Sequence, residues 1–165
     1  MYRVQDLEPG MVLLMESRPG SPWYDAALDA GIRWSTGCVM VHAALVGNGV
    51  LINPLWHVQT DPLDLYETNG WAYRVAGSTP AQAQAAVGWA LGRVGQQYGL
   101  TELLADGARH DLKIPISDHW HPRYVVCSGF VHRAWLSAGV VLSYAPWPTP
   151  ADLLYSPTQV GARPA

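Results

Sequence analysis

The residue with the clearest capacity for chemistry is Cys127, in the stretch YVVCSGFVHRAWLSAGV. Apolar Val125 and Val126 precede it, and apolar residues at helical spacing follow it. A thiol at the start of a helix lies near the positive end of the helix dipole, which lowers its pKa from about 8.5 toward neutrality. Cys127 is therefore a candidate nucleophile, and a buried structural cysteine is the alternative that the local sequence leaves open.

A nucleophilic cysteine needs a base, and the six histidines are His42, His57, His110, His119, His121 and His132. His132 follows Cys127 by five positions, so on a helix it points well away from the thiol. The segment DHWHPRY could form a metal site from Asp118, His119 and His121, but we interpret its histidines as surface residues. We expect no metal and no cofactor.

His42 differs because it lies among apolar residues in VMVHAALV, just before Asn48-Gly49, a strong hairpin-turn signal. A two-residue turn pairs Gly47 with Val50 and Ala44 with Asn53. Side chains alternate along strands, so His42 and Asn53 share one face as diagonal neighbours, roughly 7 Å apart between backbones. An amide oxygen can fix the tautomer of an imidazole and orient it.

Two other residues share the strand parity of this pair. His57 has the same parity as Asn53 and is the second candidate for the orienting residue. Cys38 has the parity of His42 but lies four strand residues away, about 13 Å, which excludes it as the partner of His42. We also expect Cys38 and Cys127 not to form a disulfide.

The elements that must position these residues follow from turn and capping signals. We expect a strand after Pro9-Gly10, a long loop over 17–37 with a short helix at 24–30, a hairpin over 38–54 and a strand at 71–77. Helices should begin at Thr79-Pro80, at Cys127 (ending at Gly139) and at Thr149. Because strands and helices are segregated, the fold class is α+β with an antiparallel sheet.

At this point the motifs resemble a known family. CSGFV at 127–131 is similar to the nucleophile signature of NlpC-type cell-wall peptidases, a papain-like family, and ALGRVGQQYG at 90–99 resembles the helix that precedes it there. The family's remaining motifs occur before the cysteine here, as LEPGMVLLM, HAALVGNG and LINP. The chain thus resembles the circularly permuted papain-like enzymes, a group that includes bacterial hydrolases and the lecithin retinol acyltransferase type.

The resemblance implies a permuted papain-like (NlpC-type) fold, with the antiparallel sheet packed against the helix that carries the cysteine. It implies Cys127 as nucleophile, His42 as base and Asn53 as the third polar residue. Tyr124 and Ser128 are the candidate oxyanion or substrate contacts, beside the backbone N–H of Cys127. Two positions depart from the family: Val126 replaces the usual Asp before the cysteine, and Met11 the Asp of the PGD turn.

The function that we expect is a cysteine peptidase or amidase that cleaves an amide bond through a thioester, most simply in peptidoglycan stem peptides. One alternative is a hydrolase or acyltransferase that acts on a lipid acyl ester or amide, and an apolar groove near Trp34, Trp120 and Trp135 would favour it. The other alternative is a binding module without turnover. The expected partner is a peptide or acyl substrate. The shape and polarity of the cleft around Cys127 would distinguish the two.

Composition bounds these interpretations. The 165 residues, 49% hydrophobic and 14% charged, predict a single catalytic domain over 1–155 and a loose C-terminal tail over 156–165. A net charge of −3 without basic clusters argues against a nucleic-acid partner. The N-terminus lacks a signal-peptide pattern and no run predicts a membrane span. We therefore expect cytoplasmic synthesis, with phage-borne delivery or release to the wall of a bacterium.

Overall fold

A computed structural model describes residues 3–16, 23–55, 57–66, 70–97, 127–146, 148–156 and 159–161. The strands are β1 (Val12–Met15), β2 (His42–Val46), β3 (Val50–Pro54), β4 (Val58–Pro62), β5 (Gly70–Val75) and β6 (Gln159–Gly161). The helices are α1 (Trp23–Thr36), α2 (Pro80–Leu91), α4 (Cys127–Ser137) and α5 (Pro150–Leu154), with 3-10 turns η1 (Val4–Asp6) and η2 (Leu63–Tyr66). None of these helices is long and apolar enough to cross a membrane.

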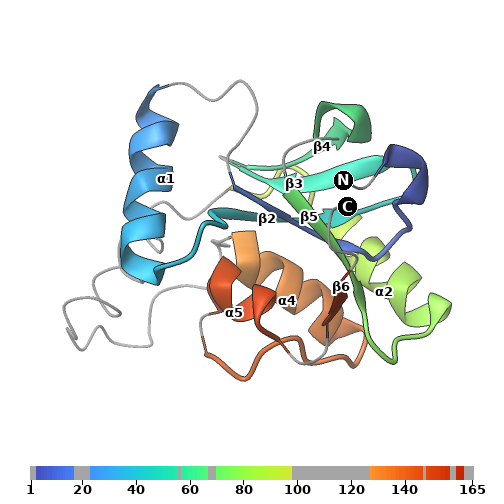
Figure 1. Cartoon of the computed structure of the whole chain (residues 1–165). Helices are drawn as coiled ribbons and strands as arrows, with labels where there is room; N and C mark the ends of the chain where they lie inside the picture. Colours follow the sequence, from blue (N-terminus) through green and yellow to red (C-terminus); the bar gives the residue numbers. More distant parts are fainter. Residues whose placement is uncertain are drawn as a thin grey trace.

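The six strands form one sheet in the order β4-β3-β2-β1-β5-β6, and every neighbouring pair is antiparallel. Helices α2 and α4 lie against one face of this sheet, while α1 stands to one side (Figure 1). The segregated α+β class with an antiparallel sheet is thus confirmed. Central strands β1 and β2 are buried on both faces, which explains the unbroken apolar runs in their sequences.

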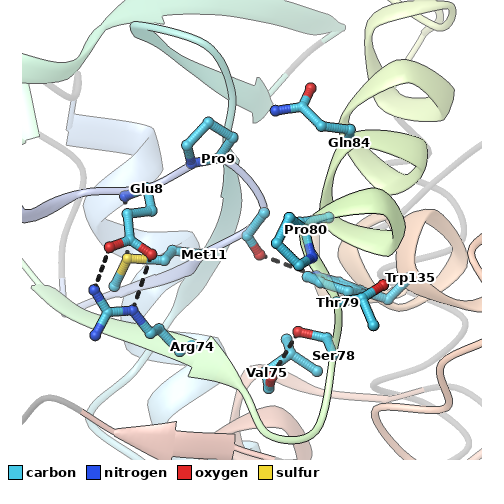
Figure 2. Close-up of a pocket in the computed structure, with 12 residues that line it drawn as sticks. Glu8, Pro9, Met11, Arg74, Val75, Ser78, Thr79, Pro80, Gln84 and Trp135 are labelled. Atoms are coloured by element: carbon cyan, nitrogen blue, oxygen red, sulfur yellow. Dashed lines mark hydrogen bonds and ion pairs between the residues drawn. The ribbon is translucent and has the colours of Figure 1, made fainter.

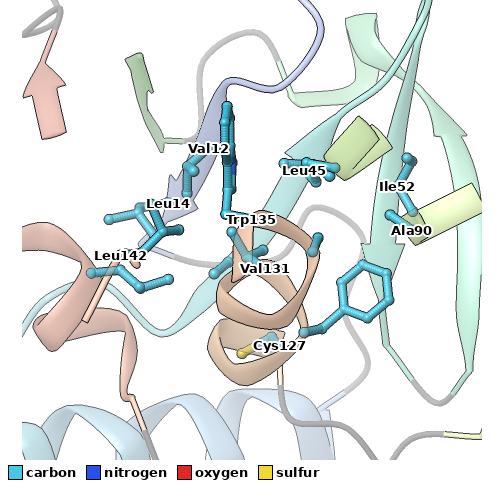
Figure 3. Close-up of a cluster of buried hydrophobic side chains, with 14 of the residues drawn as sticks. Val12, Leu14, Leu45, Ile52, Ala90, Cys127, Val131, Trp135 and Leu142 are labelled. Atoms are coloured by element: carbon cyan, nitrogen blue, oxygen red, sulfur yellow. The ribbon is translucent and has the colours of Figure 1, made fainter. Parts of the chain in front are cut away.

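Strand alternation divides the apolar side chains into two cores. The helix-side core lies between the sheet and the helices and includes Val12, Leu14, Ala43, Leu45, Ile52, Phe130, Val131 and Trp135. The second core covers the opposite face and includes Met11, Leu13, Met15, Ala44, Val46, Leu51, Leu63, Tyr66 and Ala72. In Figure 3, Val131 and Trp135 of α4 face Val12 and Leu14 of β1, with Cys127 at the far end of the helix from Trp135.

Local signals place the helix ends where the sequence predicts them. Thr79 accepts a hydrogen bond from Gln82 N, while the Gln82 side chain bonds back to the Thr79 N–H, so the capping box of α2 is present. Thr149 caps α5 with Asp152 in the same way. Gly139, with φ of +79°, ends α4, and Val140 N donates to Trp135 O.

The structure corrects four expectations. Helix α1 spans Trp23–Thr36 rather than 24–30, since Gly31 in its middle weakens the helical signal without ending the helix. Strand β2 begins at His42, so residues 38–41 are not strand, and Cys38 lies in the helix-side core. Polar strand β4 was not predicted. Residues 159–161, expected in a loose tail, form edge strand β6 beside β5.

Candidate functional site

The hairpin has the register that its turn predicts. Gly47 N donates to Val50 O at 2.8 Å, and the ladder pairs Leu45 with Ile52 and Val46 with Leu51. The resulting parity brings His42 Nε2 to 2.6 Å from Asn53 Oδ1. Both side chains are buried. The predicted contact between this histidine and this asparagine is therefore confirmed, and its catalytic role stays a prediction.

His57 does not replace Asn53 in this contact. Its side chain is exposed, and its backbone forms an isolated bridge with Gln97. Asn53 and His57 share one strand parity, but of the two it is Asn53 that bonds to His42.

Three further polar residues, to which no sequence pattern pointed, surround Asn53. Asn53 Nδ2 lies 2.7 Å from both Asp61 Oδ2 and the Tyr66 hydroxyl, and that hydroxyl lies 2.8 Å from Asp61 Oδ2. Gln59 Nε2 donates to Asp61 Oδ1 at 2.7 Å. These contacts depend on β4, which pairs Leu51 with Asp61, and on η2, which supplies Tyr66. Predicting β4 would have placed Asp61 on the Asn53 face.

Cys127 is the first residue of α4 and is buried at 3% exposure. At the other end of the helix, Trp135 Nε1 donates to Gly10 O at 3.2 Å, and Gly10 N donates to Val46 O at the end of β2. Eight helical residues extend about 12 Å, close to the length of β2. This anchoring places Cys127 toward the end of the sheet where β2 begins with His42.

Strand alternation and helix packing assign the two candidates to different layers. His42 pairs with Met15 and has the parity of Ala44, both residues of the second core. Cys127 belongs to the helix-side core. A contact between the imidazole and the thiol would therefore run around the end of β2, where His42 is the first residue, and not across a face of the sheet.

The other predicted residues have distinct environments. Ser128 is buried, and its hydroxyl donates to Pro148 O at 2.5 Å, so this proton is engaged in joining α4 to the segment before α5. Tyr124 lies outside the described residues, as do Asp118, His119, His121 and Trp120. Trp135 is a core residue, and Trp34 is 81% exposed on α1. Cys38 and Cys127 are not joined by a disulfide, as predicted.

A separate cavity of about 320 Å³ lies at the Trp135 end of the molecule (Figure 2). Residues 8–11 before β1, the end of β5 and the start of α2 line it. An ion pair between Arg74 and Glu8, 2.5 Å apart, lies on one side, with Thr79 and Gln84 on the other. None of the residues predicted to be catalytic lines this cavity.

No protein-family model matches the chain, and a search of curated proteins finds no match either. Its structure is similar to the crystal structure of metalloprotein yiiX from Escherichia coli O157:H7, DUF1105, with a TM-score of 0.70. The two are 14% identical, and the alignment covers 96% of this chain and 97% of that one. This likeness shows a shared fold. Within the ranges that the structure describes, no three His, Cys, Asp or Glu residues are grouped to hold a metal ion.

Proposed function

We propose that the chain is a cysteine hydrolase of permuted papain-like fold, with Cys127 as nucleophile, His42 as base and Asn53 as orienting residue. The observation that carries the proposal is the His42–Asn53 hydrogen bond of 2.6 Å, at the end of the sheet toward which α4 directs Cys127. The order of elements supports it as well, since β1 to β5 all precede the cysteine helix. The permuted enzymes that the sequence resembles are expected to have the same order, with the sheet first and the cysteine helix last.

In the proposed reaction, His42 takes the proton from Cys127, and the thiolate attacks the carbonyl carbon of the substrate. The tetrahedral oxyanion receives hydrogen bonds from backbone N–H groups at the start of α4, where the helix dipole also favours negative charge. Protonated His42 then gives its proton to the leaving amine, and a thioester remains on Cys127. Water activated by His42 hydrolyses the thioester, which releases the acid and restores the thiol.

Peptidoglycan stem peptides are the substrates that we propose. The similarity of the cysteine segment CSGFV and the hairpin HAALVGNG to cell-wall peptidases supports an amide substrate. The acyl-chain alternative called for an apolar groove near Trp34, Trp120 and Trp135. Trp135 is 1% exposed and bonds to the backbone of β1, so it is not available to line such a groove.

The test is to trap the acyl-enzyme. The protein is incubated with purified stem peptides or with phosphatidylcholine vesicles, quenched in acid and analysed by intact-mass spectrometry, with Cys127→Ser as control. We expect a covalent adduct with the mass of a peptide acyl fragment, together with a new free amine, in the native protein alone. An adduct with the mass of a fatty acyl chain would move the substrate to lipids, and no adduct with either would contradict the hydrolase.

A further inference from the structure

The buried Asn53 amide has a complete set of hydrogen-bond partners. Its side chain is 0% exposed, so each of its polar atoms needs a partner inside the protein. The nitrogen has two protons and donates to Asp61 Oδ2 and to the Tyr66 hydroxyl, each at 2.7 Å. The oxygen Oδ1 is left for His42 Nε2.

The reverse orientation of the amide is unfavourable because of Asp61. An ionised carboxylate only accepts hydrogen bonds. If Oδ1 and Nδ2 of Asn53 were exchanged, an amide oxygen would face the carboxylate oxygen at 2.7 Å with no proton between them. Tyr66 adds to the constraint, because its hydroxyl donates to Asp61 Oδ2 and accepts a proton from Asn53 Nδ2.

Gln59 fixes the carboxylate itself. Its amide donates to Asp61 Oδ1 at 2.7 Å, so Asp61 accepts from Gln59, Asn53 and Tyr66 together. The side chains come from β3, β4 and η2, which hold the acceptor in place from three directions.

We infer that Asp61, with Tyr66, sets the tautomer of the neutral His42 ring through Asn53. An amide oxygen that can only accept requires a proton on Nε2 of His42 at a distance of 2.6 Å. A neutral imidazole carries one proton, so Nδ1 is left with the lone pair. Asp61 and Tyr66 are thus positioning residues that act through Asn53.

This assignment identifies the basic atom, a step that rests on the proposed function. The proton leaves the Cys127 sulfur and forms a new bond to Nδ1 of His42, while Nε2 keeps its proton against Asn53. The result is a thiolate and an imidazolium, with no change in oxidation state. If Nδ1 carried the proton instead, the nitrogen facing Asn53 would hold the lone pair and the thiol would have no acceptor.

The test is the ¹⁵N spectrum of the His42 ring, recorded through two-bond couplings in uniformly labelled protein over a pH series, with the tautomer read on the neutral ring at the alkaline end. We expect a pyrrole-type signal for Nε2 and a pyridine-type signal for Nδ1. Asp61→Asn retains the size of the side chain but can donate as well as accept, so the Asn53 amide can reverse. The two tautomers should then approach roughly equal populations.

Asp64→Asn is the matched control, since it makes the same change at an exposed carboxylate of η2 that takes no part in the hydrogen bonds joining Asn53, Asp61, Tyr66 and Gln59, so the tautomer should not change. A proton on Nδ1 in the native protein, or a ring spectrum that Asp61→Asn leaves unchanged, would overturn the inference. If Asp61→Asn fails to fold, Tyr66→Phe takes its place, since it removes the other acceptor of the Asn53 amide and should raise the share of the Nδ1 tautomer. Failure of the proposed function is a separate result: it would appear as the Nε2 tautomer together with a Cys127 that forms no adduct.

Discussion

The indole nitrogen of Trp135 donates a hydrogen bond to the carbonyl oxygen of Gly10 at 3.2 Å, which joins α4 to the turn that starts β1. This contact determines how far α4 is displaced along the sheet, and hence where Cys127 lies relative to β2. Gly10 has φ of +89°. A Cβ atom on it would lie 2.7 Å from Ala83 Cβ and 3.1 Å from Trp135 Cζ2.

Gly10→Ala should therefore destabilise the protein by about 3 kcal/mol, since a positive φ and overpacking against α2 each cost on the order of 1–3 kcal/mol. Gly49→Ala is the control: its φ is +77°, but a Cβ there meets nothing within 4 Å. We expect a loss of about 1 kcal/mol for Gly49→Ala in urea unfolding. Equal losses for the two variants would contradict the close approach of β1, α2 and α4 at Gly10.

Gly88 offers the opposite effect. It lies in the interior of α2, and a Cβ there would meet nothing within 4 Å. Gly88→Ala should stabilise the protein by about 0.5–1 kcal/mol, because alanine loses less backbone entropy in a helix. Gly95 has equally open surroundings but φ of +89°, so Gly95→Ala should destabilise. Thermal unfolding of the pair should give shifts of opposite sign, and shifts of the same sign would argue against the assigned end of α2.

His132 on α4 predicts a dependence of stability on pH. Its Nδ1 is buried and has no partner among the described residues. Burial, and secondarily the charge of Arg133, lower the pKa of His132 below its usual value. The unfolded chain binds this proton near pH 6.5, whereas the folded chain binds it only at lower pH. Stability should therefore fall as the pH decreases below about 6.5 toward the lowered folded pKa.

The measurement is the free energy of unfolding in urea for the native protein and His132→Gln between about pH 5 and 7, the range that brackets the reference pKa. The variant should show a smaller loss of stability on acidification. Parallel curves for the two proteins would show that His132 does not titrate differently in the folded and unfolded states.

Asn53 and His57 should differ in their effect on Cys127. Asn53→Ala removes the acceptor of the His42 proton, so alkylation of Cys127 should slow, and by less than in His42→Ala, because the base itself remains. His57 is exposed, and the hydrogen bond of the His42 ring goes to Asn53, so His57→Ala should leave the rate unchanged. Rates of iodoacetamide labelling measure both effects. A larger effect from His57→Ala than from Asn53→Ala would assign the orienting role to His57 instead.

Much of the fold could be predicted because short-range signals determine it. Asn48-Gly49 fixes the hairpin register, and with it the His42–Asn53 contact. Thr79, Thr149 and Gly139 define helix ends through contacts with neighbours a few residues away. Such signals do not need the tertiary structure in order to be recognised.

The rest depends on long-range pairing. Strand β4 is an edge strand with mostly half-buried or exposed residues, so it has no apolar run, and its register determines whether Asp61 reaches Asn53. The sequence also did not indicate that α4 packs on one face of the sheet while the His42 side chain lies on the other. That assignment follows from the pairing of His42 with Met15, which are far apart in the chain.

The relative reactivity of the two cysteines tests the catalytic assignment most directly. Cys127 and Cys38 are 3% and 5% exposed, so a difference in labelling reports chemistry rather than access. With iodoacetamide at about pH 6, below the reference pKa of a thiol, Cys127 should be alkylated more than about tenfold faster than Cys38 if its thiol pKa is lowered. His42→Ala should slow Cys127 alone and shift its pH profile upward. Equal labelling of the two cysteines, unchanged by His42→Ala, would contradict the account and identify Cys127 as a structural thiol in a binding module.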